Sequence, residues 1–220
     1  MVVKKVLRGV QNTDFLQALT LINTYRRRQE DVQAKKPNDE TTGVSCKRSA
    51  VLALRRADYQ LLRDHVLTGF LRAAKFLTLE HIFLDRDLPY QTQLVPLAAI
   101  LAELGDKWEE IGTKQNVRQW YWSGVLGELY GGAVESRHAG DLPVLGWIRE
   151  GAPLPTTVRD SNFNPHRLLT LRTRNSAAYK GIYALLDKVA VDRVRNQEYV
   201  VPGEGSEDDR CGVQDAVYDE

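Results

Sequence analysis

Apolar residues recur at intervals of three and four along most of the chain, the spacing that places side chains on one face of an α-helix. The first stripe follows Asn12 and Thr13, either of which can cap a helix, and ends at three arginines, whose charge suits a helix C-terminus. Strand-like alternation is nearly absent. We therefore predict a mainly α, multi-helix fold. The stripes are Phe15, Leu19, Ile22 and Tyr25; Tyr59, Leu62, Val66, Phe70, Ala73 and Leu77; Leu94, Leu97, Ala98, Leu101 and Leu104; Val117, Tyr121, Val125 and Leu129.

Glycine, proline and small polar residues separate the stripes and predict where helices begin and end. Residues 29–42 are polar and contain Pro37, so we expect a mobile loop there. Gly105 should end one helix, whose Pro96 must then lie in its first turn, and two adjacent glycines should stop the next. Further helices are expected over 142–149, from Asn164–Pro165 through Leu171, and after a cap at Asn175, with Ala178, Ile182, Leu185 and Leu186 facing inward.

The helical pattern stops near Val189. The residues beyond it include Pro202, two glycines and an acidic run, with almost no apolar periodicity. We predict one helical domain over residues 5–188, followed by a disordered acidic tail over residues 189–220.

Composition narrows the class of protein without naming an activity. Hydrophobic residues make up 43% of the chain and charged residues 27%, as in ordinary globular domains. No apolar run approaches the roughly 20 residues needed to cross a bilayer, so we expect no membrane partner. The two cysteines, Cys46 and Cys211, form no disulfide framework, which suggests a reducing cytoplasm.

Charge is distributed unevenly along the chain. Residues 187–220 contain 10 acids and 4 bases, whereas residues 1–186 contain 26 bases and 19 acids. A basic body suits a polyanionic partner such as nucleic acid.

The most suggestive basic segment runs from Arg167 to Lys180 and contains no acid. Arginine side chains together with amide and hydroxyl donors near a helix start are what a phosphate backbone requires. The alternative is an ordinary solvated helix face whose tyrosine extends its hydroxyl into water. On the first reading, the DNA-binding residues are Arg167, Arg172, Arg174, Asn175, Tyr179 and Lys180.

Evidence for catalysis is weak. The chain has no phosphate-binding glycine loop and no nucleophile elbow. Its four histidines lie far from one another and from the cysteines in sequence, so we predict neither a metal site nor a cofactor, and read the histidines as surface or satisfied helix residues. Glu128 and Glu135, on either side of a glycine turn, are better explained as charged surface than as a site, and the nearby tyrosine and tryptophan residues as core. The histidines are His65, His81, His138 and His166.

Five strings resemble one protein family. They are NTDFLQALTL (Asn12–Leu21), VSCKR (Val44–Arg48), DLPYQTQLVPLAAILAELG (Asp87–Gly105), WYWSGVLGELYGGAVESRHAGDLP (Trp120–Pro143) and LLTLRTRNSAAYKGIYALL (Leu168–Leu186). The chain is similar, over this region, to the bacterial family related to the GmrSD modification-dependent restriction endonucleases.

The resemblance implies the helical region that, in such proteins, joins a ParB-like nucleotide-binding domain to a metal-dependent His-Asn-His nuclease domain. The Asp-Gly-Gln-Gln-Arg motif of the first domain is absent here, and no histidine follows His166 to serve the second. We therefore expect a split or truncated anti-phage restriction protein without catalytic residues, which contacts DNA or a separately encoded ParB-like or nuclease subunit. The alternatives are a free-standing interaction module that docks a separately encoded partner and a decayed gene product without activity.

Overall fold

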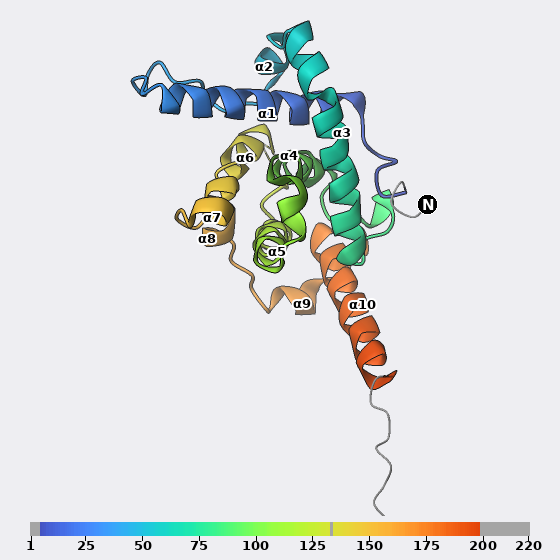
Figure 1. Cartoon of the computed structure of the whole chain (residues 1–220). Coiled ribbons are helices and arrows are strands. Elements are labelled where there is room, and N and C mark those ends of the chain that lie inside the picture. The colour runs from blue at the N-terminus through green and yellow to red at the C-terminus, as the bar shows by residue number, and fades with distance from the viewer. Residues whose placement is uncertain (1–4, 133, 199–220) are drawn as a thin grey trace, which may run out of the picture.

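The computed structural model describes residues 5–132 and 134–198, and all regular secondary structure in these two ranges is helical (Figure 1). The predicted fold class is therefore confirmed. The α-helices are α1 (Asn12–Gln33), α2 (Arg48–Leu52), α3 (Arg56–Leu79), α4 (Leu94–Leu104), α5 (Ile111–Leu126), α6 (Val134–Asp141), α7 (Val144–Glu150), α8 (Thr156–Arg159), α9 (Arg167–Thr170) and α10 (Ala177–Glu198); the 3-10 turns are η1 (Asp85–Asp87), η2 (Gln91–Gln93) and η3 (Gly105–Glu109).

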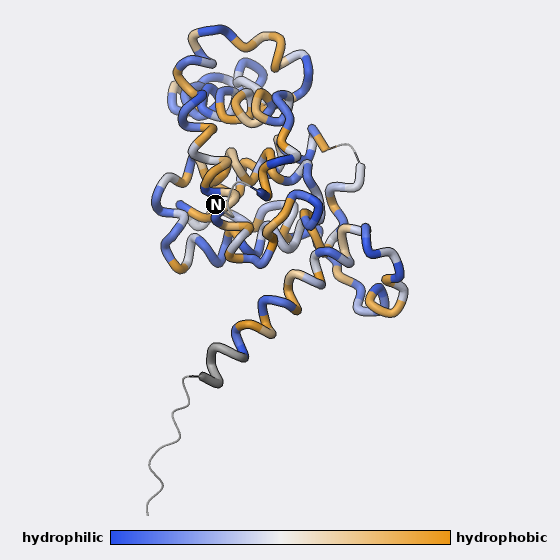
Figure 2. Tube along the Cα trace, turned by 90° about the vertical axis from the view of Figure 1, so that its right-hand side faces the viewer, coloured by the Kyte–Doolittle hydropathy of each residue, from blue (hydrophilic) through white to orange (hydrophobic). Residues whose placement is uncertain are grey.

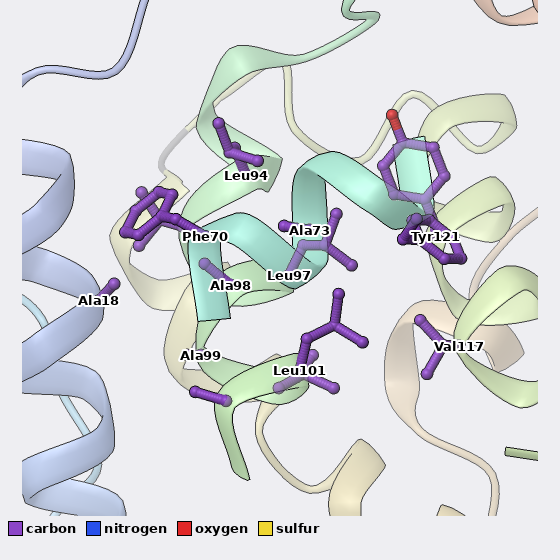
Figure 3. Packing of buried hydrophobic residues seen from close by; sticks show 14 of the residues in the cluster. Ala18, Phe70, Ala73, Leu94, Leu97, Ala98, Ala99, Leu101, Val117 and Tyr121 are labelled. Atoms are coloured by element: carbon purple, nitrogen blue, oxygen red, sulfur yellow. The ribbon is translucent and has the colours of Figure 1, made fainter. Parts of the chain in front are cut away.

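Helix α4 forms the centre of the molecule. Ten of its eleven residues are buried, because α1, α3, α6 and α7 pack around it and α5 lies beside it in Figure 1. Figure 3 shows Leu97 and Leu101 of α4 among side chains from α3 and α5. Pro96 occupies the first turn of α4, and Gly105 follows the helix with a positive φ of 61°, as the sequence predicted.

The apolar stripes account for most of the core. Leu19 and Ile22 of α1, and Val117 and Tyr121 of α5, are buried as predicted. Leu186 is an exception: it was expected to face inward, but its side chain is exposed on α10. Among the described helices α10 packs mainly on α5, and Leu186 lies instead at a small open pocket lined also by Leu168 and Leu171.

Several element boundaries were predicted wrongly. Helix α1 continues past its three arginines to Gln33, so the expected loop is helical in its first residues. The rest of that loop is tied down by Asp31, whose carboxylate accepts hydrogen bonds from Lys36 and from both the backbone and the hydroxyl of Thr42. Helix α9 has a single turn and stops at Thr170 rather than Leu171. The contacts of Asp31 with Lys36 and Thr42 leave no periodic signal in the sequence, so the pattern could not predict them.

Helix α10 extends ten residues beyond Lys188, through the position where the tail was expected to start (Figures 1 and 2). The last helix therefore runs past residue 188, where the helical domain was predicted to end, and residues 199–220 of the predicted tail lie outside the described part of the chain. The helix continues because Val189, Ala190 and Val191 do not interrupt it, although their side chains are exposed.

Candidate nucleic-acid interface

The predicted basic segment folds as two helices separated by a break. Residues 171–173 are irregular, and a turn over 174–176 leads into α10. Ser176 caps that helix, one residue later than predicted: its Oγ accepts a hydrogen bond from the backbone N–H of Tyr179 at 3.3 Å. The Asn175 side chain is therefore not the cap and remains exposed.

The start of α10 and the turn η1 enclose a pocket of about 710 Å³, which we call the α10 pocket. Side chains at positions 179, 180, 183, 184 and 187 reach it from one side of α10, because residues three and four apart share a helix face. Four of the six predicted DNA-binding residues line this pocket. Its lining is Arg174, Asn175, Tyr179 and Lys180 together with His81, Phe83, Arg86, Asp87, Tyr183, Ala184 and Asp187.

The cations of the α10 pocket are largely available to a ligand. Within the described residues, the guanidinium of Arg174 has no hydrogen bond or ion pair, and that of Arg86 lies only within 3.9 Å of the Asp87 carboxylate. Lys180 donates one hydrogen bond, to the carbonyl oxygen of Leu88 at 3.3 Å, which leaves two of its donors. The N-terminal end of α10 adds a partial positive charge from its unpaired backbone N–H groups.

Two carboxylates also line the α10 pocket. The Oδ2 atom of Asp187 lies 2.7 Å from Nδ1 of His81, so this carboxylate is already engaged by the imidazole. His81 occupies the left-handed region with φ 62°, at the sharp turn that leaves α3. The Asp87 carboxylate lines the same pocket from the turn η1. The pocket therefore has cations at the start of α10 and on η1, one carboxylate farther along α10 at Asp187, and one on η1 at Asp87 beside Arg86.

The other two predicted residues lie outside the α10 pocket. Arg167 donates to Oε1 of Glu128 at 3.0 Å, at a smaller pocket of about 290 Å³. That ion pair removes much of its capacity to bind phosphate. Arg172 is exposed in the break between α9 and α10, and within the described residues its guanidinium has no partner. The structure thus brings four of the six predicted residues together at the α10 pocket and leaves Arg167 and Arg172 outside it.

Sequence analysis missed Arg86, His81, Phe83 and Tyr183 as members of the same pocket. The first three lie in the connector after α3, about ninety residues from α10, and nothing in their local pattern indicates that contact. Tyr183 carried a signal, since it lies on the same face of the last helix as Tyr179 and Lys180.

Helix α10 is anchored at a buried carboxylate. Glu80, which is 3% exposed, accepts hydrogen bonds from Trp122 of α5 at 2.9 Å and from Lys188 at 2.8 Å, and Arg118 lies 3.1 Å away. The helices also approach closely at Gly181, where a Cβ would lie 2.7 Å from a methyl group of Val125. These contacts hold the inner half of α10, and with it the α10 pocket, against the body.

A second polar group, the Asp141 cluster, is fully buried between α5, α6 and α8. Asp141 accepts hydrogen bonds from the indole of Trp120 at 3.0 Å, the hydroxyl of Tyr130 at 2.5 Å and the hydroxyl of Thr157 at 2.5 Å. Burial raises the pKa of Asp141, and burial next to this carboxylate raises the pKa of Tyr130 well above its usual value. Trp120, Tyr130 and Asp141 all belong to the Trp120–Pro143 string, so side chains of that string bond to one another.

Beside this cluster, Cys46 and His138 meet across ninety-two positions, with Sγ 3.6 Å from Nδ1. Burial raises the pKa of the Cys46 thiol to about 11 and lowers that of His138 to about 4, so both are neutral at physiological pH. A neutral, inaccessible thiol is not a nucleophile. Of the four histidines, His138 is not at the surface: it is buried in α6 with its Nδ1 against Cys46.

Within residues 5–132 and 134–198, no group of three or more His, Cys, Asp or Glu side chains could hold a metal ion. In the same ranges, no helix is long and apolar enough to cross a membrane.

Comparison with known proteins adds little about function. No protein-family model matches the chain, and no solved structure matches it. The chain is similar to an uncharacterised protein of Methanocaldococcus jannaschii, MJ0686, with 30% identity over 84 residues. That alignment covers 36% of this chain and 14% of the archaeal protein, so the chain corresponds to a small part of its relative.

Proposed function

We propose that this chain is the non-catalytic helical region of a DNA restriction protein similar to the GmrSD-like family, and that it contacts DNA phosphates around the start of α10. One observation carries the proposal. Arg86, Arg174 and Lys180, from two regions far apart in sequence, line one pocket at a helix N-terminus, and the guanidinium of Arg174 has no partner among residues 5–132 and 134–198. An exposed, unpaired guanidinium beside other cations is what phosphate contact requires.

The five family-like strings support the same proposal in a different way. Trp120 and Tyr130 of one string converge on Asp141 at its end, and Lys180 of another donates to Leu88 of a third. These hydrogen bonds join the strings in one folded unit, as a resemblance to one domain implies.

Salt dependence of DNA binding tests the phosphate contacts. Each neutralised phosphate releases condensed counterions, so three contacts predict a slope of log affinity against log salt of about −2.7 for duplex DNA. Arg174→Ala should make that slope shallower by about one unit. The matched control is Arg63→Ala, since Arg63 is an exposed arginine at the other end of the molecule, on the first half of α3, and should leave the slope unchanged. Equal slopes for all three proteins would reject the proposed surface.

A cleavage assay tests the non-catalytic part of the proposal. Incubation of the purified chain with modified phage DNA, nucleotide and magnesium should leave the DNA intact. Cutting that a single substitution in this chain abolishes would overturn that part.

A second candidate function is the docking of a separately encoded partner, and the exposed apolar side chains of α9 and α10 favour it. Leu169 of α9 and Leu186 of α10 are both largely exposed, and Leu186 lines a small, mostly apolar pocket together with Leu168 and Leu171. Exposed apolar side chains that gather in this way mark contact surfaces, whereas singly scattered ones do not. Translating the reading frames adjacent to this chain would identify a ParB-like or nuclease candidate. The complex with that protein should be lost in Leu169→Asp or Leu186→Asp and retained in Arg63→Ala.

A further inference from the structure

Aromatic rings line the same α10 pocket as the cations. Phe83 follows α3, and Tyr179 and Tyr183 lie one helical turn apart on α10. The ring of Tyr183 is 65% exposed, although it lies beside a pocket that could have buried it. Within the described residues its hydroxyl has no hydrogen-bond partner, so the phenol oxygen does not tie the ring to the protein. An exposed aromatic face beside the guanidinium of Arg174, which has no partner among the described residues, offers stacking and charge neutralisation together.

The volume of the pocket restricts what can enter it. About 710 Å³ lies within the range typical of small-ligand sites, roughly 300–1,000 Å³, and suits a single nucleotide but no double helix. A base inside a duplex is stacked on its neighbours, and a protein reaches its faces only when the base is unpaired or extruded. Single-strand binding sites accordingly combine a cationic groove with aromatic side chains on which bases stack.

The distribution of charge around the pocket favours one orientation of a bound nucleotide. Arg174 and Lys180 lie at the start of α10, where the helix dipole also favours an anion. Asp187 lies seven residues farther along, about 10 Å by the helical rise, and its carboxylate would repel a phosphate. Tyr183 lies between these two ends. A phosphate at the helix start therefore places the attached base over Tyr183.

We propose that the α10 pocket binds one unstacked nucleotide of a DNA strand, with its phosphate at Arg174 and Lys180 and its base against Tyr183 and Phe83. This inference rests on the proposed DNA contact and makes it more specific: the surface distinguishes an unpaired nucleotide from a paired one. The chain then recognises single strands, bulges or extruded bases better than intact duplex.

The test compares three labelled DNAs at one salt concentration by fluorescence anisotropy: a short single strand, its perfect duplex, and the same duplex with one unpaired central base. Stacking of one base on an aromatic ring predicts that the single strand and the bulged duplex bind roughly ten- to a hundredfold more tightly than the perfect duplex. Adenosine monophosphate should compete with the single strand, whereas inorganic phosphate at the same concentration should compete much less.

Variants of Tyr183 separate stacking from other effects. Tyr183→Ala should abolish the preference for unpaired DNA over perfect duplex, and Tyr183→Phe should retain it, because stacking needs the ring and not the hydroxyl. Tyr59→Ala is the matched control, since Tyr59 is an exposed tyrosine on α3 away from the pocket. Because both tyrosines are exposed, these variants should fold normally.

The outcomes distinguish this inference from the function on which it rests. Equal affinity for all three DNAs, with a salt slope that still depends on Arg174, would overturn the nucleotide pocket and leave the phosphate contact standing. A preference for unpaired DNA that survives in Tyr183→Ala would also overturn it. No binding to any of the DNAs would overturn both proposals.

Discussion

The Asp141 cluster and the α10 pocket are made of similar side chains but use their polar atoms differently. In the Asp141 cluster, indole, phenol and hydroxyl donors all point at one buried carboxylate, so each donor is satisfied within the protein. At the α10 pocket, guanidinium and phenol groups face an open volume, and several have no protein partner. Satisfied buried groups stabilise a fold, whereas unsatisfied exposed groups are available to a ligand. The contrast separates residues that hold the structure from those that can act.

The largest expected effect is the loss of the Asp141 carboxylate. Asp141→Ala leaves the indole of Trp120 and two buried hydroxyls without an acceptor, and breaking a buried network of this kind costs roughly 3–5 kcal/mol of unfolding free energy. Urea denaturation followed by tryptophan fluorescence measures it. Asp64→Ala, at an exposed carboxylate on α3, is the control and should change the unfolding free energy by less than about 0.5 kcal/mol. A similarly small change for Asp141→Ala would show that the cluster does not carry stability.

The next effect is a pH dependence that arises beside the same cluster. Burial lowers the pKa of His138 from 6.5 to about 4, so the unfolded chain binds a proton at this residue more readily than the folded protein. The contribution of the neutral His138 to the free energy of unfolding is therefore complete above pH 6.5. It is lost as the pH falls toward 4, by about 3 kcal/mol in total.

His138→Gln removes that titration. The difference in unfolding free energy between this variant and the wild type should change by about this amount between pH 7 and pH 4, while titrations common to both proteins cancel. A difference that stays constant over this range would contradict the burial of a neutral imidazole.

A smaller effect concerns the cap of α10. Ser176→Ala should cost roughly 1 kcal/mol because the backbone N–H of Tyr179 loses its acceptor, whereas Asn175→Ala should cost only a few tenths. Thermal unfolding of the two variants compares neighbouring residues in the same turn. The reverse order would restore Asn175 as the cap.

The smallest expected effect on stability lies at the α10 pocket itself. Arg174→Ala should change the unfolding free energy by less than about 0.5 kcal/mol, because its exposed guanidinium makes no contact that folding needs. Chemical denaturation of this variant should overlay that of the wild type even where DNA binding is weakened. A large loss of stability would show that Arg174 stabilises the fold, as the Asp141 cluster does.

Periodicity predicted the helices around α4 well, because a buried helix must repeat its apolar residues every three or four positions. It predicted neither partner of the pair Cys46 and His138, which lie ninety-two residues apart and follow no local pattern. The same limit explains the candidate site. Arg174 and Lys180 were recognisable from their own segment, but Arg86 joins them only because α3 and its connector end beside α10.

Element ends were the weakest part of the prediction for a related reason. Helix α1 runs past its arginines because Asp31 finds partners in the following loop, and α10 runs past Val189 with exposed valines on its surface. The apolar repeat marks where a helix is packed, not how far it extends.

The unequal packing of α10 also makes it a spacer. Lys188 is bonded to the body through Glu80, while the helix continues to Glu198, ten residues and about 15 Å farther by the helical rise. The turns of α10 that follow Lys188 continue the axis of the packed part and lead away from the body (Figure 2). A partner that binds these exposed turns would therefore contact the same helix that lines the α10 pocket without covering the pocket itself.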